Sequence, residues 1–145
     1  MLAYYYALLR KKQGEVARLN SCQASLQGKQ QEFTANEHKC LEPELAVRTW
    51  HGKHASDFDN IREARIHAPY LEIAGAQFSK VFAAIAAKIS SLLAEIASIE
   101  QTIARILAEQ AAEAARAAEA TQAKQEAKSS KSAKSSILSM FSKLK

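Results

Sequence analysis

Apolar residues in the second half of the chain recur at alternating spacings of four and three. The series comprises Phe78, Phe82, Ile85, Ile89, Leu92, Ile96, Ile99, Ile103 and Ile106. This alternation is typical of a helix that packs along one seam against another helix. The sequence therefore predicts one long helix, which we assign to residues 56–128, with a continuous apolar seam.

A weaker version of the same pattern runs through the first forty residues. Its apolar positions are Leu2, Tyr5, Leu9, Val16, Leu19, Cys22, Leu26, Phe33 and Cys40. Polar side chains also fall on this face, namely Lys12, Gln23, Gln30 and Glu37. We expect a first helix over residues 2–40 whose seam meets the seam of the second helix.

The segment between these helices contains the residues that interrupt helical structure. Proline disfavours helical geometry at the residue before it, so Glu42-Pro43 predicts a kink or a break of the helix over residues 41–44. A short helical piece should follow from Pro43 to Trp50. Gly52 can adopt a positive φ at little steric cost, which favours a chain reversal over residues 49–55.

Two further features are predicted around this reversal. Trp50, the only tryptophan, should lay its ring across both helices and act as an anchor. Ser56 and Asp59 have the spacing of a capping box, with Asp in place of the usual Glu, so we expect the second helix to start there.

The fold class that follows is all-α. We expect a long antiparallel, coiled-coil-like helical hairpin over residues 1–128, with a solvated helical overhang after the seam ends. Only two prolines and four glycines interrupt the chain, which agrees with helical structure. Residues 129–145 are predicted to be a flexible basic tail with a short amphipathic end. The apolar side of that end consists of Ile137, Met140, Phe141 and Leu144.

A two-helix hairpin rarely buries enough apolar area to stand alone, so we expect an oligomer or a complex. Apolar residues of the second helix that lie off its seam are the candidate partner contacts: Ile73, Val81, Leu93 and Leu107. A homodimer and a heteromeric four-helix arrangement are both open. We favour the heteromer, because the polar residues on the first seam could select a partner.

Charge is distributed unevenly along the chain. The net charge is +5, and residues 121–145 contain six lysines against the single acid Glu126, so the rest of the chain is neutral. Nucleic-acid binding would require a basic surface on the body of the protein, and we therefore expect none. The basic tail instead favours contact with a membrane surface or a partner.

No set of residues indicates catalytic chemistry. The chain lacks a glycine-rich phosphate loop and a Cys-x-x-Cys pair. Histidines and a cysteine near the reversal, His38, Cys40, His51 and His54, point to different faces or lie in a turn. Cys22 and Cys40 should lie about 27 Å apart in one helix, too far for a disulfide. We expect no enzyme, no metal site and no cofactor.

The Trp50-His51-Gly52 reversal between two long helices resembles the WXG100 superfamily of small proteins exported by type VII (Esx-type) secretion. Further segments resemble the YwqH-like family of Gram-positive bacteria, which is encoded beside LXG-domain toxins. These segments are Glu42-Pro43-Glu44-Leu45, Phe58-Asp59-Asn60-Ile61-Arg62 and the N-terminal Tyr-Tyr-x-x-Leu-Leu stretch. The resemblance covers residues 4–110 and implies an accessory or targeting partner, chaperone-like, for an LXG toxin.

One departure from the WXG100 pattern affects where the protein should act. Exported members carry an aromatic residue followed four positions later by an acid, after the second helix. No aromatic after Gly52 is followed in this way. We therefore expect a cytoplasmic protein that is either exported together with its partner or stays behind as a chaperone. The alternative function is a structural coiled-coil protein attached to a membrane surface through its basic amphipathic tail.

Overall fold

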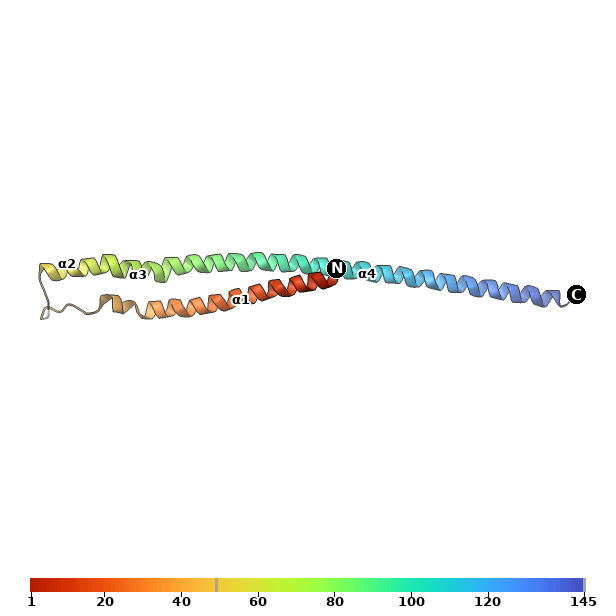
Figure 1. Cartoon of the computed structure of the whole chain (residues 1–145), viewed down its shortest axis with the longest axis horizontal. Coiled ribbons are helices and arrows are strands. Elements are labelled where there is room, and N and C mark those ends of the chain that lie inside the picture. The colour runs from red at the N-terminus through yellow and green to blue at the C-terminus, as the bar shows by residue number, and fades with distance from the viewer. Residues whose placement is uncertain (49, 145) are drawn as a thin grey trace. The chain divides into compact units, whose positions relative to one another are not determined.

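The computed structural model describes residues 1–48 and 50–144. It is all-α, with two long helices of 40 and 90 residues packed antiparallel as a hairpin and no strand in the described part of the chain (Figure 1). The predicted helical hairpin is therefore confirmed. The chain divides into two compact units, one formed by residues 7–98 and one by residues 1–6 with 99–145. Each unit is described by itself below.

The first long helix changes type near its end. The α-helix α1 covers Leu2–Ala35, and a 3-10 helix, η1, covers Glu37–Leu41. Asn36 separates the two, and its side-chain Nδ2 donates to the Glu32 carbonyl at 2.8 Å. Asparagine side chains compete with backbone hydrogen bonds in this way and weaken helix interiors. The predicted helix 2–40 is thus α-helical over most, but not all, of its length.

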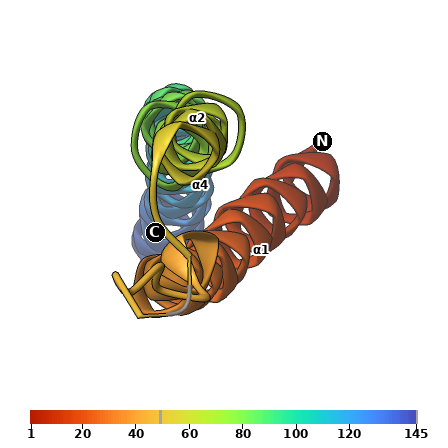
Figure 2. The same cartoon turned by 90° about the vertical axis from the view of Figure 1, so that its left-hand side faces the viewer.

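The linker after η1 is less regular than predicted. Glu42 is extended, with φ −87° and ψ 146°, as expected for a residue before proline, so of the two predicted outcomes, a kink or a break, the helix breaks there. The helical piece expected from Pro43 to Trp50 is absent from the described residues of this segment, where one turn closes by Trp50 N–H donating to Ala46 O at 3.0 Å. Figure 2 shows this linker rising to the second helix. Thr49, within the predicted reversal, lies outside the described residues.

The second long helix begins at Lys53, three residues earlier than predicted. Gly52 occupies the N-cap with φ 96° and ψ −169°, confirming the positive φ expected there. Ser56 N–H donates to the Gly52 carbonyl at 3.1 Å, so Ser56 lies within the helix. The capping box proposed for Ser56 and Asp59 is therefore wrong. Glycine supplies the cap because φ near 96° is strained for any residue with a Cβ.

Two π-helical turns interrupt this helix near Pro69. The elements in order are α2 (Lys53–Arg62), the π turn η2 (Glu63–His67), α3 (Ala68–Glu72), the π turn η3 (Ile73–Gln77) and α4 (Phe78–Ser142). Pro69 lacks an N–H and lies in the first turn of α3. The π turns alter which residues face the first helix, because each π turn contains more residues than an α turn.

The helix α4 continues to Ser142, through the segment 129–142 that was predicted to be flexible. That segment contains neither glycine nor proline, so nothing in its backbone chemistry stops the helix. Every described residue from 107 to 144 is exposed, which agrees with the solvated overhang predicted beyond the seam. Lys145 lies outside the described residues.

The predicted seam of α4 forms the core. In the unit 7–98 the buried residues are Ala55, Ile85, Leu92 and Ile96, and Leu92 is fully buried. In the other unit Ile99 and Ile103 are buried. The remaining seam residues, Phe78, Phe82, Ile89 and Ile106, are half-buried. The core is a single row of side chains, because each helix offers only one apolar stripe.

Candidate functional site

Trp50 lies at the turn end of the unit 7–98 and is 41% exposed. Its ring centroid is 5.4 Å from that of Phe58 in α2, at an interplanar angle of 53°. The prediction that the ring anchors both helices is therefore wrong. The first long helix stops at Leu41, and an irregular linker follows. The aromatic ring that Trp50 contacts, that of Phe58, belongs to α2.

Arg62 fastens the linker to α2. Its Nη1 donates to the Pro43 carbonyl at 2.8 Å, and its Nη2 donates to Asp59 Oδ1 at 2.6 Å. The guanidinium carbon also lies 5.5 Å from the Phe58 ring centroid, a cation–π contact. The Arg62 side chain is only 11% exposed. Sequence reasoning missed this role, although an Asp and an Arg three residues apart on a helix do indicate an ion pair.

His67, at the end of η2, lies between two carboxylates. Its Nε2 is 2.9 Å from Glu37 Oε1 of η1, and its Nδ1 is 2.7 Å from Glu63 Oε2 of the same π turn. The hydrogen bond to Glu37, followed by that to Glu63, raises the pKa of His67 above its ordinary value. The side chain is 13% exposed. This contact joins the end of the first long helix to the second.

An aromatic cluster adjoins the His67 contact. Tyr70 stacks on Phe33 with ring centroids 4.9 Å apart, and Phe78 meets Phe33 edge-on at 5.7 Å. The Tyr70 hydroxyl donates to the Phe33 carbonyl at 2.6 Å near the end of α1. Burial is the main cause that raises the pKa of Tyr70. Phe33, Tyr70 and Phe78 are called the aromatic cluster below.

Three of the four polar residues predicted on the first seam, Lys12, Gln30 and Glu37, have partners on the second helix. Gln30 Nε2 donates to the Ala74 carbonyl in η3 at 2.9 Å. Lys12 Nζ lies 2.6 Å from Glu95 Oε2, and this hydrogen bond raises the pKa of Lys12 and lowers that of Glu95. Together with Glu37, these residues form a set of polar contacts between the two helices. Their polar groups are therefore already paired within the hairpin.

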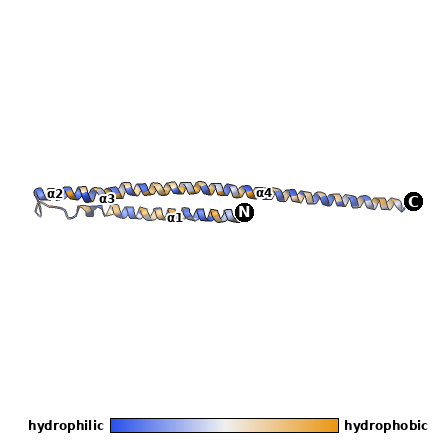
Figure 3. Ribbon diagram, turned by 45° about the horizontal axis from the view of Figure 1, so that its top comes forward, coloured by the Kyte–Doolittle hydropathy of each residue, from blue (hydrophilic) through white to orange (hydrophobic). Residues whose placement is uncertain are grey.

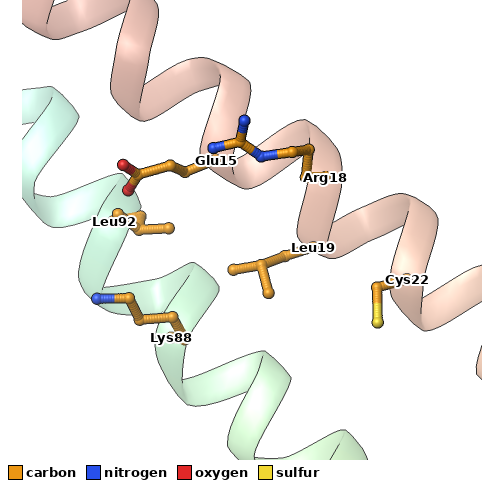
Figure 4. A pocket seen from close by; sticks show the side chains of 6 residues that line it. All are labelled: Glu15, Arg18, Leu19, Cys22, Lys88 and Leu92. Carbon is orange, nitrogen blue, oxygen red and sulfur yellow. The ribbon is translucent and has the colours of Figure 1, made fainter.

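A shallow hollow of about 430 Å³ lies between α1 and α4 (Figure 4). The residues that line it are Glu15, Arg18, Leu19, Cys22, Lys88 and Leu92. Leu19 and Leu92 reach toward each other from the two helices. Cys22 is exposed, contrary to its predicted place on the seam. No group of three or more potential ligands that could hold a metal ion occurs among the described residues.

The predicted partner residues do not form one face. Val81 is 46% exposed and Leu93 51% exposed, as expected for residues off the seam, but they are twelve residues apart. At about 100° per residue this places them roughly 120° apart, on opposite flanks of the seam. Leu107, in the unit of residues 1–6 and 99–145, is 44% exposed. Ile73 is half-buried, because it begins the π turn that Gln30 contacts.

The predicted apolar side of the tail is present as a continuous surface. Ile137, Met140, Phe141 and Leu144 are between 54% and 82% exposed and line one hollow of about 270 Å³. Figure 3 shows hydrophobic colour returning at this end after a hydrophilic stretch. Separately, the helix Lys53–Ser142 contains an 18-residue window of mean hydropathy 1.6, which meets the length and composition test for a membrane span. Core helices of soluble proteins meet the same test.

Comparison of this chain with protein-family models, with curated proteins and with solved structures finds no match.

Proposed function

We propose that this protein is a WXG100-like accessory or targeting partner for an LXG-domain toxin of a type VII secretion system, acting by helix–helix association. The observation that carries the proposal is the combination of a one-row core with exposed apolar side chains on both flanks of it. Val81 lies on one flank and Leu93 on the other, about half-exposed. A helix or hairpin that packs on either flank would bury side chains that the hairpin leaves in water.

The energetics of a two-helix protein support a partner of this kind. Only four of the described residues of the unit 7–98 are buried, and the fully buried one among them is Leu92. Completing a four-helix arrangement would cover further sides of the seam and increase the apolar area that is buried. The polar groups Lys12, Gln30 and Glu37 are already paired within the hairpin, so they do not carry partner choice. Recognition then rests on the two apolar flanks.

The resemblance of the Trp50-x-Gly52 reversal to WXG100 proteins supports the choice of partner class. In the second half of the chain no aromatic residue is followed four positions later by an acid. This departure from the WXG100 pattern supports export only together with a partner. The proposed partner is an LXG toxin, another WXG100-like small helical protein, or both. A homodimer is the competing assembly.

Copurification tests this proposal. The full chain, tagged and expressed in cells that carry its own neighbouring genes, should retain an LXG-domain or WXG100-like protein through washes, because both flanks would be buried in the complex. The same chain expressed alone in a type VII-competent strain should stay inside the cells. Recovery of a homodimer with no helical neighbour, or efficient export of the chain on its own, would contradict the proposal.

A second candidate function, a structural protein attached to a membrane surface, is favoured by the tail. Its apolar side is exposed, and Lys131, Lys134 and Lys143 lie on the same short segment. Basic amphipathic helices of this kind bind anionic membranes by burying their apolar side, with about 1 kcal/mol from each lysine near the surface.

Flotation of the full chain with anionic vesicles tests the second candidate. Phe141→Ser should reduce the bound fraction strongly, because Phe141 lies within the apolar side and is 68% exposed. Leu138→Ser is the matched control, since Leu138 is 71% exposed but does not line the tail hollow. Equal flotation of both variants with the parent, or no flotation of the parent, would count against membrane attachment.

A further inference from the structure

Both ring nitrogens of His67 face carboxylate oxygens at hydrogen-bonding distance. Nε2 is 2.9 Å from Glu37 Oε1 and Nδ1 is 2.7 Å from Glu63 Oε2. Ionised carboxylates only accept hydrogen bonds, whereas a neutral imidazole has a single N–H to donate. The arrangement therefore suits the imidazolium ring, which donates to both acids. A neutral ring would turn a lone pair toward one of the two carboxylates.

The two hydrogen bonds span two different elements. Glu37 belongs to η1, at the end of the first long helix, and Glu63 belongs to η2, in the second. The ring thus connects the helices where the apolar seam has not yet begun, since that seam starts at Phe78. Around it the helices are joined by the aromatic cluster and by polar contacts, including the Tyr70 hydroxyl on Phe33 O and the Gln30 amide on Ala74 O.

We propose that His67 is a proton-dependent latch, which holds η1 on η2 while its ring carries two protons and releases the turn half of the hairpin when it loses one. The apolar seam from Phe78 onward has no titratable side chain at its centre, so it would stay closed. Opening is then local and does not require global unfolding. The aromatic cluster lies directly beside the latch and would become accessible to another chain.

The titratable groups near the His67 ring come from several elements. Glu37 faces it from η1 and Glu63 from η2. Cys40 and Glu37 of η1 both lie close enough to Tyr70 of α3 to act on it electrostatically. Tyr70 remains neutral through the relevant pH range, because its pKa is raised.

The direction of the pH effect follows from linkage. The pKa of His67 is higher in the folded chain than in the unfolded chain, since the two carboxylates favour its charged form. The stabilisation is therefore complete below the ordinary histidine pKa of about 6.5 and is lost as the pH rises through the folded value. Local stability of the turn half should fall toward alkaline pH.

Titration of the histidine ring protons by NMR, together with amide hydrogen exchange in residues 63–77, tests the latch on the full chain. We expect His67 to titrate clearly above the ordinary histidine value of about 6.5. Exchange in this segment, compared at about pH 6 and about pH 8.5 after correction for the intrinsic rate, should accelerate with loss of the ring proton. Exchange around Leu92 should not change.

Three variants separate the latch from a merely structural histidine. Glu37→Gln keeps an acceptor and removes a charge, so the His67 titration should move to lower pH. His67→Gln should make the exchange of residues 63–77 fast at both pH values. His54→Gln is the control and should behave as the parent. A His67 titration at or below the ordinary histidine value, or exchange in His67→Gln that still slows at low pH as in the parent, would overturn the proposal.

Discussion

Leu92→Ala should lower the free energy of unfolding by about 2–5 kcal/mol, because truncating a buried leucine removes apolar contacts and leaves a cavity. Leu92 is the one described side chain of large size that is fully buried, with 0% exposure. The row of core residues is one side chain wide, so few neighbours can move in to fill the space. Urea denaturation followed by circular dichroism measures the change.

Leu93→Ala is the matched control for this experiment. Leu93 is the next residue of the same helix, is 51% exposed and loses the same atoms on substitution. In the monomeric hairpin it should change the stability by no more than about 0.5 kcal/mol. Similar losses for both variants would mean that the seam does not run where the structure has it. If Leu93→Ala destabilises only at high protein concentration, its flank is covered in an assembly.

Glutamate at Val81 or at Leu93 should abolish association on the flank where it is placed while leaving the hairpin helical. A charge buried opposite an apolar partner surface, without a countercharge, costs about 3–5 kcal/mol, so affinity should fall by at least about a hundredfold. The two positions lie on opposite flanks of the seam, roughly 120° apart. The single variants therefore report separately which flank the partner uses.

Ala87→Glu provides the control for both variants. Ala87 is exposed and lies six residues from each of the two positions, about 120° from either and opposite the seam. Light scattering of the purified chain, and copurification with its neighbours, should then show association for Ala87→Glu as for the parent. Undiminished association of both flank variants would exclude the flanks as the interface and with them the main support for the proposed function.

The seam of α4 was predictable from the sequence because its information is local. Nine apolar residues alternate at four and three, and an uninterrupted α-helix places such residues on one side whatever surrounds it. The same holds for the positive φ of Gly52 and the extended Glu42 before Pro43, which depend on the geometry of one or two residues. All three expectations agree with the structure.

Three other expectations do not agree with the structure. Trp50 was expected to bridge both helices, and it contacts Phe58 while remaining 41% exposed. Val81 and Leu93 were expected to share one partner surface, and helix geometry separates them. The tail was expected to be flexible, and α4 continues through it to Ser142.

The sequence by itself determined that the chain forms two long helices, where they reverse and which stripe of the second helix is buried. These follow from backbone restrictions and apolar periodicity, which act over a few residues. Only the tertiary structure decided that Glu37 and Glu63 meet at His67, and that Gln30 meets Ala74. The physical reason is register. Each π turn shifts which residues face the first helix, and a regular period of 3.6 residues does not predict this shift. The length of the linker then sets which turns of α1 lie opposite the π turns.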